Sequence, residues 1–176
     1  MPASALVSVE EYLHTSYDPD CDYVDGRVVE RNWGDLSHSD LQGELCAYFW
    51  VRRKTSGVHA FVEQRVQVSP TRFRIPDICV MLGPKPTEQI FRTPPFLAIE
   101  ILSPEDRMPR ILERIDDYLR FGVSYVWVID PSTQEGWVHT RAGVEPAVDG
   151  VLRTHNPELD VALPEIFAAL RDEGIE

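Results

Sequence analysis

Three short apolar runs dominate the hydrophobic pattern of the chain. They are rich in Val, Ile, Leu and Phe and have prolines at or near their ends: Arg74–Leu82, Pro95–Pro104 and Ser124–Pro131. Runs of this length and composition are typical of buried β-strands rather than helices. We therefore expect three buried strands, with the last of them as a candidate for the centre of a sheet.

Helical periodicity indicates four helices around these strands. Ser8 followed by Glu11 forms a capping box, and Gly122 is a suitable C-cap. Pro109 is tolerated only in a first turn, which fixes the start of the helix that carries it. The predicted helices run from Ser8 to before Asp18, from a Ser37 cap to about Lys54, from near Arg107 or Met108 to Gly122, and from Leu163 to Leu170.

Turn residues and alternation predict further strands. Asp25-Gly26 lies between two short apolar pairs and is a typical two-residue hairpin turn, in which glycine supplies a positive φ. Ala60–Val68 alternates in its later half as a half-buried strand does. A second hairpin is predicted from Gly136–Arg141 and Val144–Val148. A proline-rich loop joins the first two apolar runs.

The order of these elements constrains the fold. Strand, helix and strand follow one another between Glu100 and Asp130, which favours a mixed sheet that is parallel in part and flanked by helices. The predicted class is α/β or α+β. A chain of 176 residues is long enough to bury a sizeable core, and we expect one domain over residues 1–176.

Charge and cysteine content bear on nucleic-acid binding and on the cellular compartment. The formal net charge of −12 argues against a broad basic surface for nucleic acid, although a local basic cleft stays open. Cys21, Cys46 and Cys79 show no metal-binding or disulfide spacing, which favours a reducing compartment. We find neither a leader peptide pattern nor a membrane-spanning stretch, and predict a cytoplasmic protein.

Two of the apolar runs each contain one carboxylate, Asp77 and Glu100. Burying a carboxylate costs several kcal/mol unless it is paired, hydrogen-bonded or bound to a metal. On neighbouring strands the two would suit a hard cation such as Mg²⁺. Alternatively, each could lie at a strand end, cap a neighbouring backbone group or pair with an arginine. For the two carboxylates together, we favour a metal-binding site over these structural roles.

An ordered set of motifs resembles a known family. The motifs include Glu11-Tyr12-Leu13, the Asp22–Gly26 hairpin, His38, Pro76-Asp77, Glu100–Pro104, Tyr118, and Gly122-Val123 leading into Tyr125–Pro131. Together they resemble the Uma-type restriction endonuclease family, within the PD-(D/E)XK nuclease superfamily. The likeness covers most of the chain.

The resemblance implies a restriction-endonuclease-like domain, with a central sheet and a helix on each face. It implies Mg²⁺ (or Mn²⁺) held by Asp77, Glu100 and the backbone carbonyl of Ile101, where the metal activates a water for attack on a phosphodiester. The resemblance also implies His38 as a further catalytic candidate. Glu63 is a weaker candidate for the wall of the cleft, based only on its place in a neighbouring strand. The expected partner is nucleic acid, with DNA preferred, and we expect a homodimer.

One position departs from the superfamily. The catalytic lysine would lie two residues after Glu100, where this chain has Leu102. In the Uma-type pattern it lies four residues before the tyrosine, where this chain has Arg114. Arginine keeps the charge and can bind phosphate, but it cannot act as a base at neutral pH. Alternatively, Arg114 is a solvated residue at the border of the apolar helix face.

These observations favour a metal-dependent endonuclease with Arg114 contacting phosphate. The alternative is a catalytically weak or inactive nuclease-fold protein that binds nucleic acid or a protein partner. A third possibility is a self-associating structural protein that uses the apolar stretches Phe91–Leu97 and Tyr125–Trp137, although these stretches are more simply core.

Overall fold

A six-stranded sheet forms the centre of the molecule. The structure is a computed structural model and describes residues 6–32 and 34–171. In spatial order the sheet runs β10-β9-β8-β7-β6-β3. Its strands are β3 (Val58–Val62), β6 (Ile78–Leu82), β7 (Leu97–Ile101), β8 (Tyr125–Asp130), β9 (Glu135–Thr140) and β10 (Gly143–Pro146).

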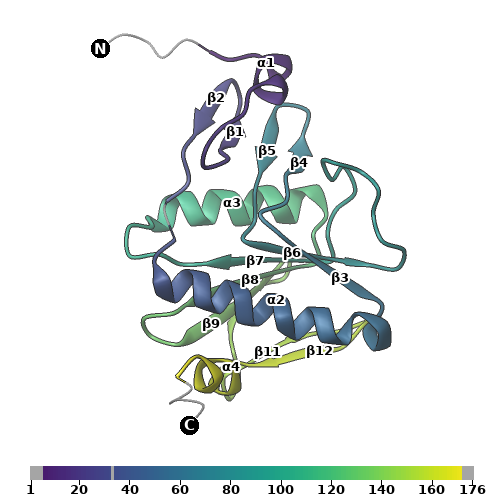
Figure 1. Cartoon of the computed structure of the whole chain (residues 1–176), viewed down its shortest axis with the longest axis vertical. Helices are drawn as coiled ribbons and strands as arrows, with labels where there is room; N and C mark the ends of the chain where they lie inside the picture. Colours follow the sequence, from purple (N-terminus) through teal and green to yellow (C-terminus); the bar gives the residue numbers. More distant parts are fainter. Residues whose placement is uncertain (1–5, 33, 172–176) are drawn as a thin grey trace.

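Helices cover both faces of this sheet (Figure 1). α3 (Met108–Phe121) packs on one face, and α2 (Leu36–Ser56) and α4 (Leu163–Leu170) pack on the other. Alternate residues of a strand point to opposite faces. Accordingly, Ile99 of β7 belongs to the α2 side of the core and Ala98 to the α3 side. Glu100 shares the parity of Ala98 and therefore faces α3.

The strand order explains why the sheet is mixed. β7 and β8 are parallel and joined through α3, whereas the other neighbours in this sheet are antiparallel. The predicted mixed sheet flanked by helices is confirmed, as is the inner position of the Ser124–Pro131 strand. A short hairpin of β11 (Val151–Thr154) and β12 (Leu159–Ala162) adds Leu152 and Val161 to the α2 side of the core. This hairpin was not predicted.

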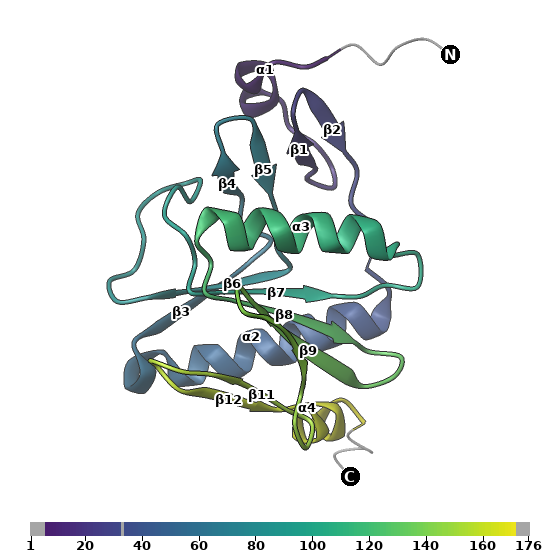
Figure 2. The same ribbon diagram turned by 180° about the vertical axis from the view of Figure 1, so that it is seen from behind.

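A second, smaller sheet lies beyond α3, away from the central sheet (Figure 2). Its core is a cluster of the aromatic residues Tyr12, Tyr23 and Phe73. Its strands run in the order β2-β1-β5-β4, next to helix α1. The elements are α1 (Val9–His14), β1 (Asp22–Val24), β2 (Arg27–Val29), β4 (Val66–Ser69) and β5 (Arg72–Arg74).

Local chemistry at the N-terminus agrees with the prediction. The Ser8 side chain accepts the Glu11 N–H at 3.1 Å and caps α1. Asp25 and Gly26 have φ angles of 49° and 90°, as a two-residue turn between β1 and β2 requires. Both the cap and the hairpin are confirmed.

Two long strand predictions are wrong. Ala60–Val68 divides into β3 and β4, which lie in different sheets, because Glu63 adopts a left-handed φ of 49° and turns the chain. Arg74–Leu82 divides into β5 and β6. Pro76 between them has no N–H for a strand ladder, and the Ile75 N–H is taken by the Asp22 carboxylate at 3.0 Å. Asp77 therefore lies just before β6, not inside a strand.

The predicted Ser37 cap of the first long helix is also wrong. α2 begins at Leu36, and its N-cap is Asp35, whose Oδ1 accepts the His38 N–H at 2.9 Å. Both residues are suitable caps by type. The observed cap lies two residues before the predicted one, because the helical turn already includes Leu36 and Ser37.

This difference can be tested by substitution. Asp35→Ala removes the acceptor for the His38 N–H and should lower the free energy of unfolding by about 1 kcal/mol. Ser37→Ala is the matched control and should change it by less than about 0.5 kcal/mol, because Ser37 is exposed within the first turn. Urea denaturation measures both. Equal losses in the two variants would contradict the assignment.

Candidate active site

The two predicted carboxylates meet at the β6–β7 pair. These strands are antiparallel, with Ile78 opposite Ile99. The next position outward therefore sets Asp77 opposite Glu100. Asp77 is 4% exposed and Glu100 is 1% exposed. The chain thus buries two carboxylates side by side at the entry to β6.

Asp77 is held by four groups from distant parts of the chain. Oδ1 accepts Nη2 of Arg31 at 2.8 Å, and Oδ2 accepts the Ile101 N–H at 2.7 Å. Nε2 of His38 lies 3.2 Å from Oδ2, and the Asp77 carbonyl accepts Nε2 of Gln42 at 2.9 Å. His38 and Gln42 lie four residues apart in α2, so they reach the same point.

Asp77 and His38 shift one another's ionisation. Burial raises the pKa of Asp77, but the His38 hydrogen bond and the charges of Arg114 and Arg31 outweigh burial, so the pKa is lowered. Burial lowers the pKa of His38, but the bond to Asp77 outweighs burial and raises it. Both shifts favour an ionised Asp77 beside a protonated imidazole.

Glu100 has two partners, both from α3. Oε1 accepts the Tyr118 hydroxyl at 2.7 Å, and Oε2 lies 2.9 Å from Nη1 of Arg114. Arg114 and Tyr118 are four residues apart and share one helix face. Burial raises the pKa of Glu100 to about 7, more than the Arg114 charge lowers it.

The alternative of a solvated Arg114 is wrong. Its side chain is 13% exposed. Its Nη2 donates to the Ile75 carbonyl at 2.7 Å, and its Nε lies 3.6 Å from Oδ2 of Asp22. Arg114 therefore joins Glu100 to the N-terminal hairpin that carries Asp22.

Arg31 was not predicted, yet it is the arginine that neutralises Asp77. It follows β2, is 11% exposed, and its Nη1 also lies 3.5 Å from Oε1 of Glu63. Glu63 is exposed at the rim, and its N–H donates to the Asp77 carbonyl at 3.1 Å. The residues around Arg31 lack periodicity, and no local pattern in the sequence indicates its contact 46 residues away.

Further buried charges continue this network toward the small sheet. Nη1 of Arg74 donates to Oδ2 of Asp22 at 3.0 Å, and its Nε donates to Oδ2 of Asp117 at 2.7 Å. Arg72 contacts Asp117 at 2.9 Å. The network links β1, β5 and α3 through alternating charges.

Both structural roles considered for the acidic pair, capping a backbone group and pairing with arginine, are therefore observed. Asp77 lies at a strand start and accepts a backbone N–H, and each carboxylate pairs with an arginine. Pairing explains how the charges are tolerated, but not why they are there. Well-packed apolar residues usually serve stability as well as or better than a buried ion pair. A cluster of buried, strongly shifted groups is typical of a functional site.

A hard divalent cation fits the donor chemistry only after a rearrangement. Asp77 and Glu100 offer carboxylate oxygens, and Mg²⁺ is commonly held by one or two carboxylates with waters and substrate phosphates. Within residues 6–32 and 34–171, however, no group of at least three His, Cys, Asp or Glu residues is arranged to hold a metal. Arg31 and Arg114 already occupy one oxygen of each carboxylate. A cation would have to displace them.

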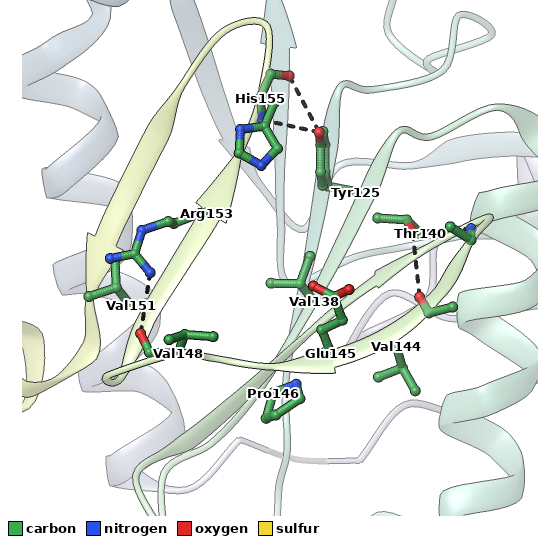
Figure 3. A pocket seen from close by; sticks show the side chains of 12 residues that line it. Tyr125, Val138, Thr140, Val144, Glu145, Pro146, Val148, Val151, Arg153 and His155 are labelled. Carbon is green, nitrogen blue, oxygen red and sulfur yellow. Dashed lines mark hydrogen bonds between the residues drawn. The ribbon is translucent and has the colours of Figure 1, made fainter.

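Two cavities are relevant to the site. One of about 240 Å³ is lined by Arg31 and Arg114 and lies between the β1–β2 hairpin and α3. A larger one of about 450 Å³ lies between the β9–β10 hairpin and β11 (Figure 3). There Tyr125 bonds the His155 backbone, and Arg153 donates to the Val148 carbonyl. Asp77 and Glu100 line neither cavity, but the smaller one is lined by the two arginines that contact them.

Neither lysine of the chain takes the place of the catalytic lysine that the resemblance implies. Lys54 lies in the last turn of α2, and Lys85 is exposed in the loop after β6. Among the described residues, neither forms a salt bridge or hydrogen bond with Asp77 or Glu100.

Comparisons with known proteins identify a family and a shared fold. The family Uma2, described as "Putative restriction endonuclease", matches residues 9–171. A crystal structure described as "a putative nuclease belonging to DUF820", from Anabaena variabilis, matches with a TM-score of 0.80 and 24% identity. The match covers 93% of this chain and 99% of that chain, and it shows a shared fold. A search among curated proteins finds no match.

Over the part of the chain that the structure describes, no helix combines the length and apolar character needed to span a bilayer.

The ionisation of Glu100 predicts a pH dependence in metal-free buffer. Its pKa of about 7 in the folded chain exceeds its ordinary value of 4.5. The folded state therefore binds the extra proton, and its stabilising effect is lost as pH rises from about 4.5 to about 7. Between pH 4.5 and 8, the unfolding free energy of the wild type should fall relative to Glu100→Gln by something on the order of 3 kcal/mol.

Urea denaturation of both proteins across this pH range measures the effect. The comparison with Glu100→Gln cancels much of the titration of other groups, His38 included. A difference between the two proteins that stays constant with pH would contradict the shift.

Proposed function

Because the chain belongs to the Uma2 family, as its motifs predicted, we propose that it is a metal-dependent endonuclease that hydrolyses phosphodiester bonds in nucleic acid, preferably DNA. The observation that carries the proposal is the buried pair of Asp77, just before β6, and Glu100, in the neighbouring strand β7, with Arg114 at 2.9 Å from Glu100. Acidic pairs of this kind suit a catalytic cation better than they suit stability.

Each residue of the site has a proposed role. Asp77, Glu100 and, by the family resemblance, the Ile101 carbonyl would hold Mg²⁺ or Mn²⁺. Bound there, the cation supplies Lewis-acid chemistry, lowering the pKa of a water and neutralising charge on the phosphate. His38 keeps Asp77 ionised and correctly oriented through its 3.2 Å contact. The Ile101 N–H, at 2.7 Å, fixes the same carboxylate from the strand side.

Arg114 takes the place of the usual lysine. When it leaves Glu100, its planar guanidinium binds the phosphate through two parallel donors and stabilises the charge that develops there. It does not accept a proton at neutral pH, since the pKa of arginine is too high. Water activation therefore depends on the cation, and we expect slow cleavage.

A second function is favoured by one observation. Arg31 and Arg114 balance the charges of Asp77 and Glu100 without any cation. A chain that stays in this arrangement binds nucleic acid or a protein partner without cutting. The two functions differ in whether the carboxylates ever become free to bind metal.

Two further expectations belong to this proposal. A homodimer would let two sites act on both strands of a duplex. A cytoplasmic location remains a prediction from the sequence.

Metal binding provides the first test. Isothermal titration calorimetry with Mg²⁺ and Mn²⁺, in the presence of a short DNA duplex, should show binding to the wild type and its loss in Asp77→Asn. Asp116→Asn is the matched control, because Asp116 is an exposed carboxylate of α3 that pairs with Arg120. Equal binding in all three proteins, or none in the wild type, would rule out the metal site.

Cleavage by Arg114→Lys separates the two functions. Lysine restores a group that can hold and help to activate water, so nicking of supercoiled plasmid should rise by about tenfold or more. Arg114→Gln should abolish nicking. If Arg114→Lys folds, binds DNA and still does not cut, the binding function is favoured over the nuclease.

A further inference from the structure

The cavity between the N-terminal hairpin and α3 is rich in arginine. It has a volume of about 240 Å³ and is lined by β1, β2, the segment after β2, and the first half of α3. Five of the 17 cationic residues of the chain line it. They are Arg27, Arg31, Arg74, Arg110 and Arg114.

The residues that line the cavity carry more positive than negative charge, on an acidic protein. Five arginines and four carboxylates line it, whereas the whole chain carries −12. Arg31, Arg74 and Arg114 also pair with carboxylates outside the lining, namely Asp77, Asp117 and Glu100.

Two of the four lining carboxylates are already occupied by hydrogen bonds: Asp22 by Arg74 and the Ile75 N–H, and Asp106 by Asn32 and Ser103. The first turn of α3 has no acidic residue and no side-chain cap, so no carboxylate within the helix offsets its positive dipole end.

The arginines that line the cavity are also incompletely bonded. Among the described residues, four buried side-chain nitrogen atoms lack a hydrogen bond: Arg31 Nε, Arg74 Nη2, Arg114 Nε and Trp127 Nε1. Two of these atoms still lie in ion pairs, Arg74 Nη2 at 2.7 Å from Asp117 and Arg114 Nε at 3.6 Å from Asp22, so Arg31 Nε is the clear case among the arginines. An unpaired buried donor is unfavourable and requires an explanation.

Two of the arginines that line the cavity bind the acidic pair. Arg31 contacts Asp77, and Arg114 contacts Glu100. A carboxylate presents two oxygens in one plane, whereas a phosphate presents more acceptors and a tetrahedral shape. Guanidinium groups bind phosphate through parallel, charge-assisted hydrogen bonds. The same two arginines therefore have two possible anionic partners, the acidic pair and an anion in the cavity.

We propose that this cavity binds a backbone phosphate of a nucleic-acid strand, and that Arg31 is shared between that phosphate and Asp77. The identity of the strand rests on the proposed function, whereas the anion site rests on the cavity itself. Arg110 adds a second contact from the exposed side, where its Nη2 now donates to the Glu30 carbonyl at 2.9 Å.

Sharing has a direct consequence. Phosphate in the cavity draws Arg31 from Oδ1 of Asp77 and frees that oxygen for a cation. Phosphate and cation then favour one another's binding, as linkage requires. In the absence of nucleic acid, the two carboxylates stay neutralised by arginine.

The test is calorimetric titration with inorganic phosphate in metal-free buffer that contains a chelator. The wild type should bind phosphate, and Arg31→Gln should weaken binding by about tenfold or more, because it loses a charge-assisted contact. Asp77→Asn should strengthen binding several-fold, since it releases Arg31. Arg120→Gln is the charge-matched control, at an exposed position of α3 outside the cavity, and should bind as the wild type does.

Three results would overturn the proposal: no binding by the wild type, equal weakening by Arg31→Gln and Arg120→Gln, or no gain in Asp77→Asn. If Arg31→Gln does not fold, the exposed Arg110→Gln replaces it and must also weaken binding. A short oligothymidylate should compete with phosphate, and failure to compete would rule out a nucleic-acid strand. The phosphate titration contains no metal, so its result does not depend on the proposed metal site. If the protein binds metal but not phosphate, only the proposed phosphate site in the cavity is rejected.

Discussion

The neutralisation of two buried carboxylates by two arginines is the interaction on which the rest of the site depends. Asp77, at the entry to β6, and Glu100, in the neighbouring strand β7, are both buried, and each would be strongly unfavourable there without a positive partner. Arg31 supplies the charge from beyond the N-terminal hairpin, and Arg114 supplies it from α3. The arrangement therefore holds together three layers: the central sheet, the helix above it and the small sheet beyond.

The β7–α3–β8 crossover and the small sheet bring the charged groups of the site together. The β7–α3–β8 crossover sets Glu100 beneath the helix that carries Arg114 and Tyr118. The small sheet then closes the open side of α3, and Asp22 and Arg74 extend the charged network into it. The fold thus forms a site in which Arg114 contacts Glu100 and Arg31 contacts Asp77. Whether such a site cuts depends on how readily its arginines exchange the carboxylates for phosphate.

Much of the fold could be predicted from local patterns. The helices around Ile111 and Leu163, the Asp25-Gly26 turn and the Tyr125–Asp130 strand each carry a strong period or a turn residue, and all were found. Glu63 and Ile75–Asp77 were misassigned because a left-handed residue and a proline broke apolar runs that look continuous in sequence. β11 and β12 span four residues each, too few for alternation to be distinctive. At the site, Asp77, Glu100 and Arg114 were recognisable as unusual residues in apolar or family contexts, whereas Arg31 depends on a tertiary contact that no local pattern encodes.

The most direct test is a crystal structure of the protein with Mn²⁺ and a short DNA duplex, recorded with anomalous scattering at the manganese edge. The account predicts an anomalous peak within bonding distance, roughly 2.0–2.3 Å, of Asp77 and Glu100 oxygens, with Arg31 and Arg114 turned toward phosphate. Bound DNA without such a peak, with both arginines still paired to the carboxylates, would contradict it and identify a nuclease fold that only binds.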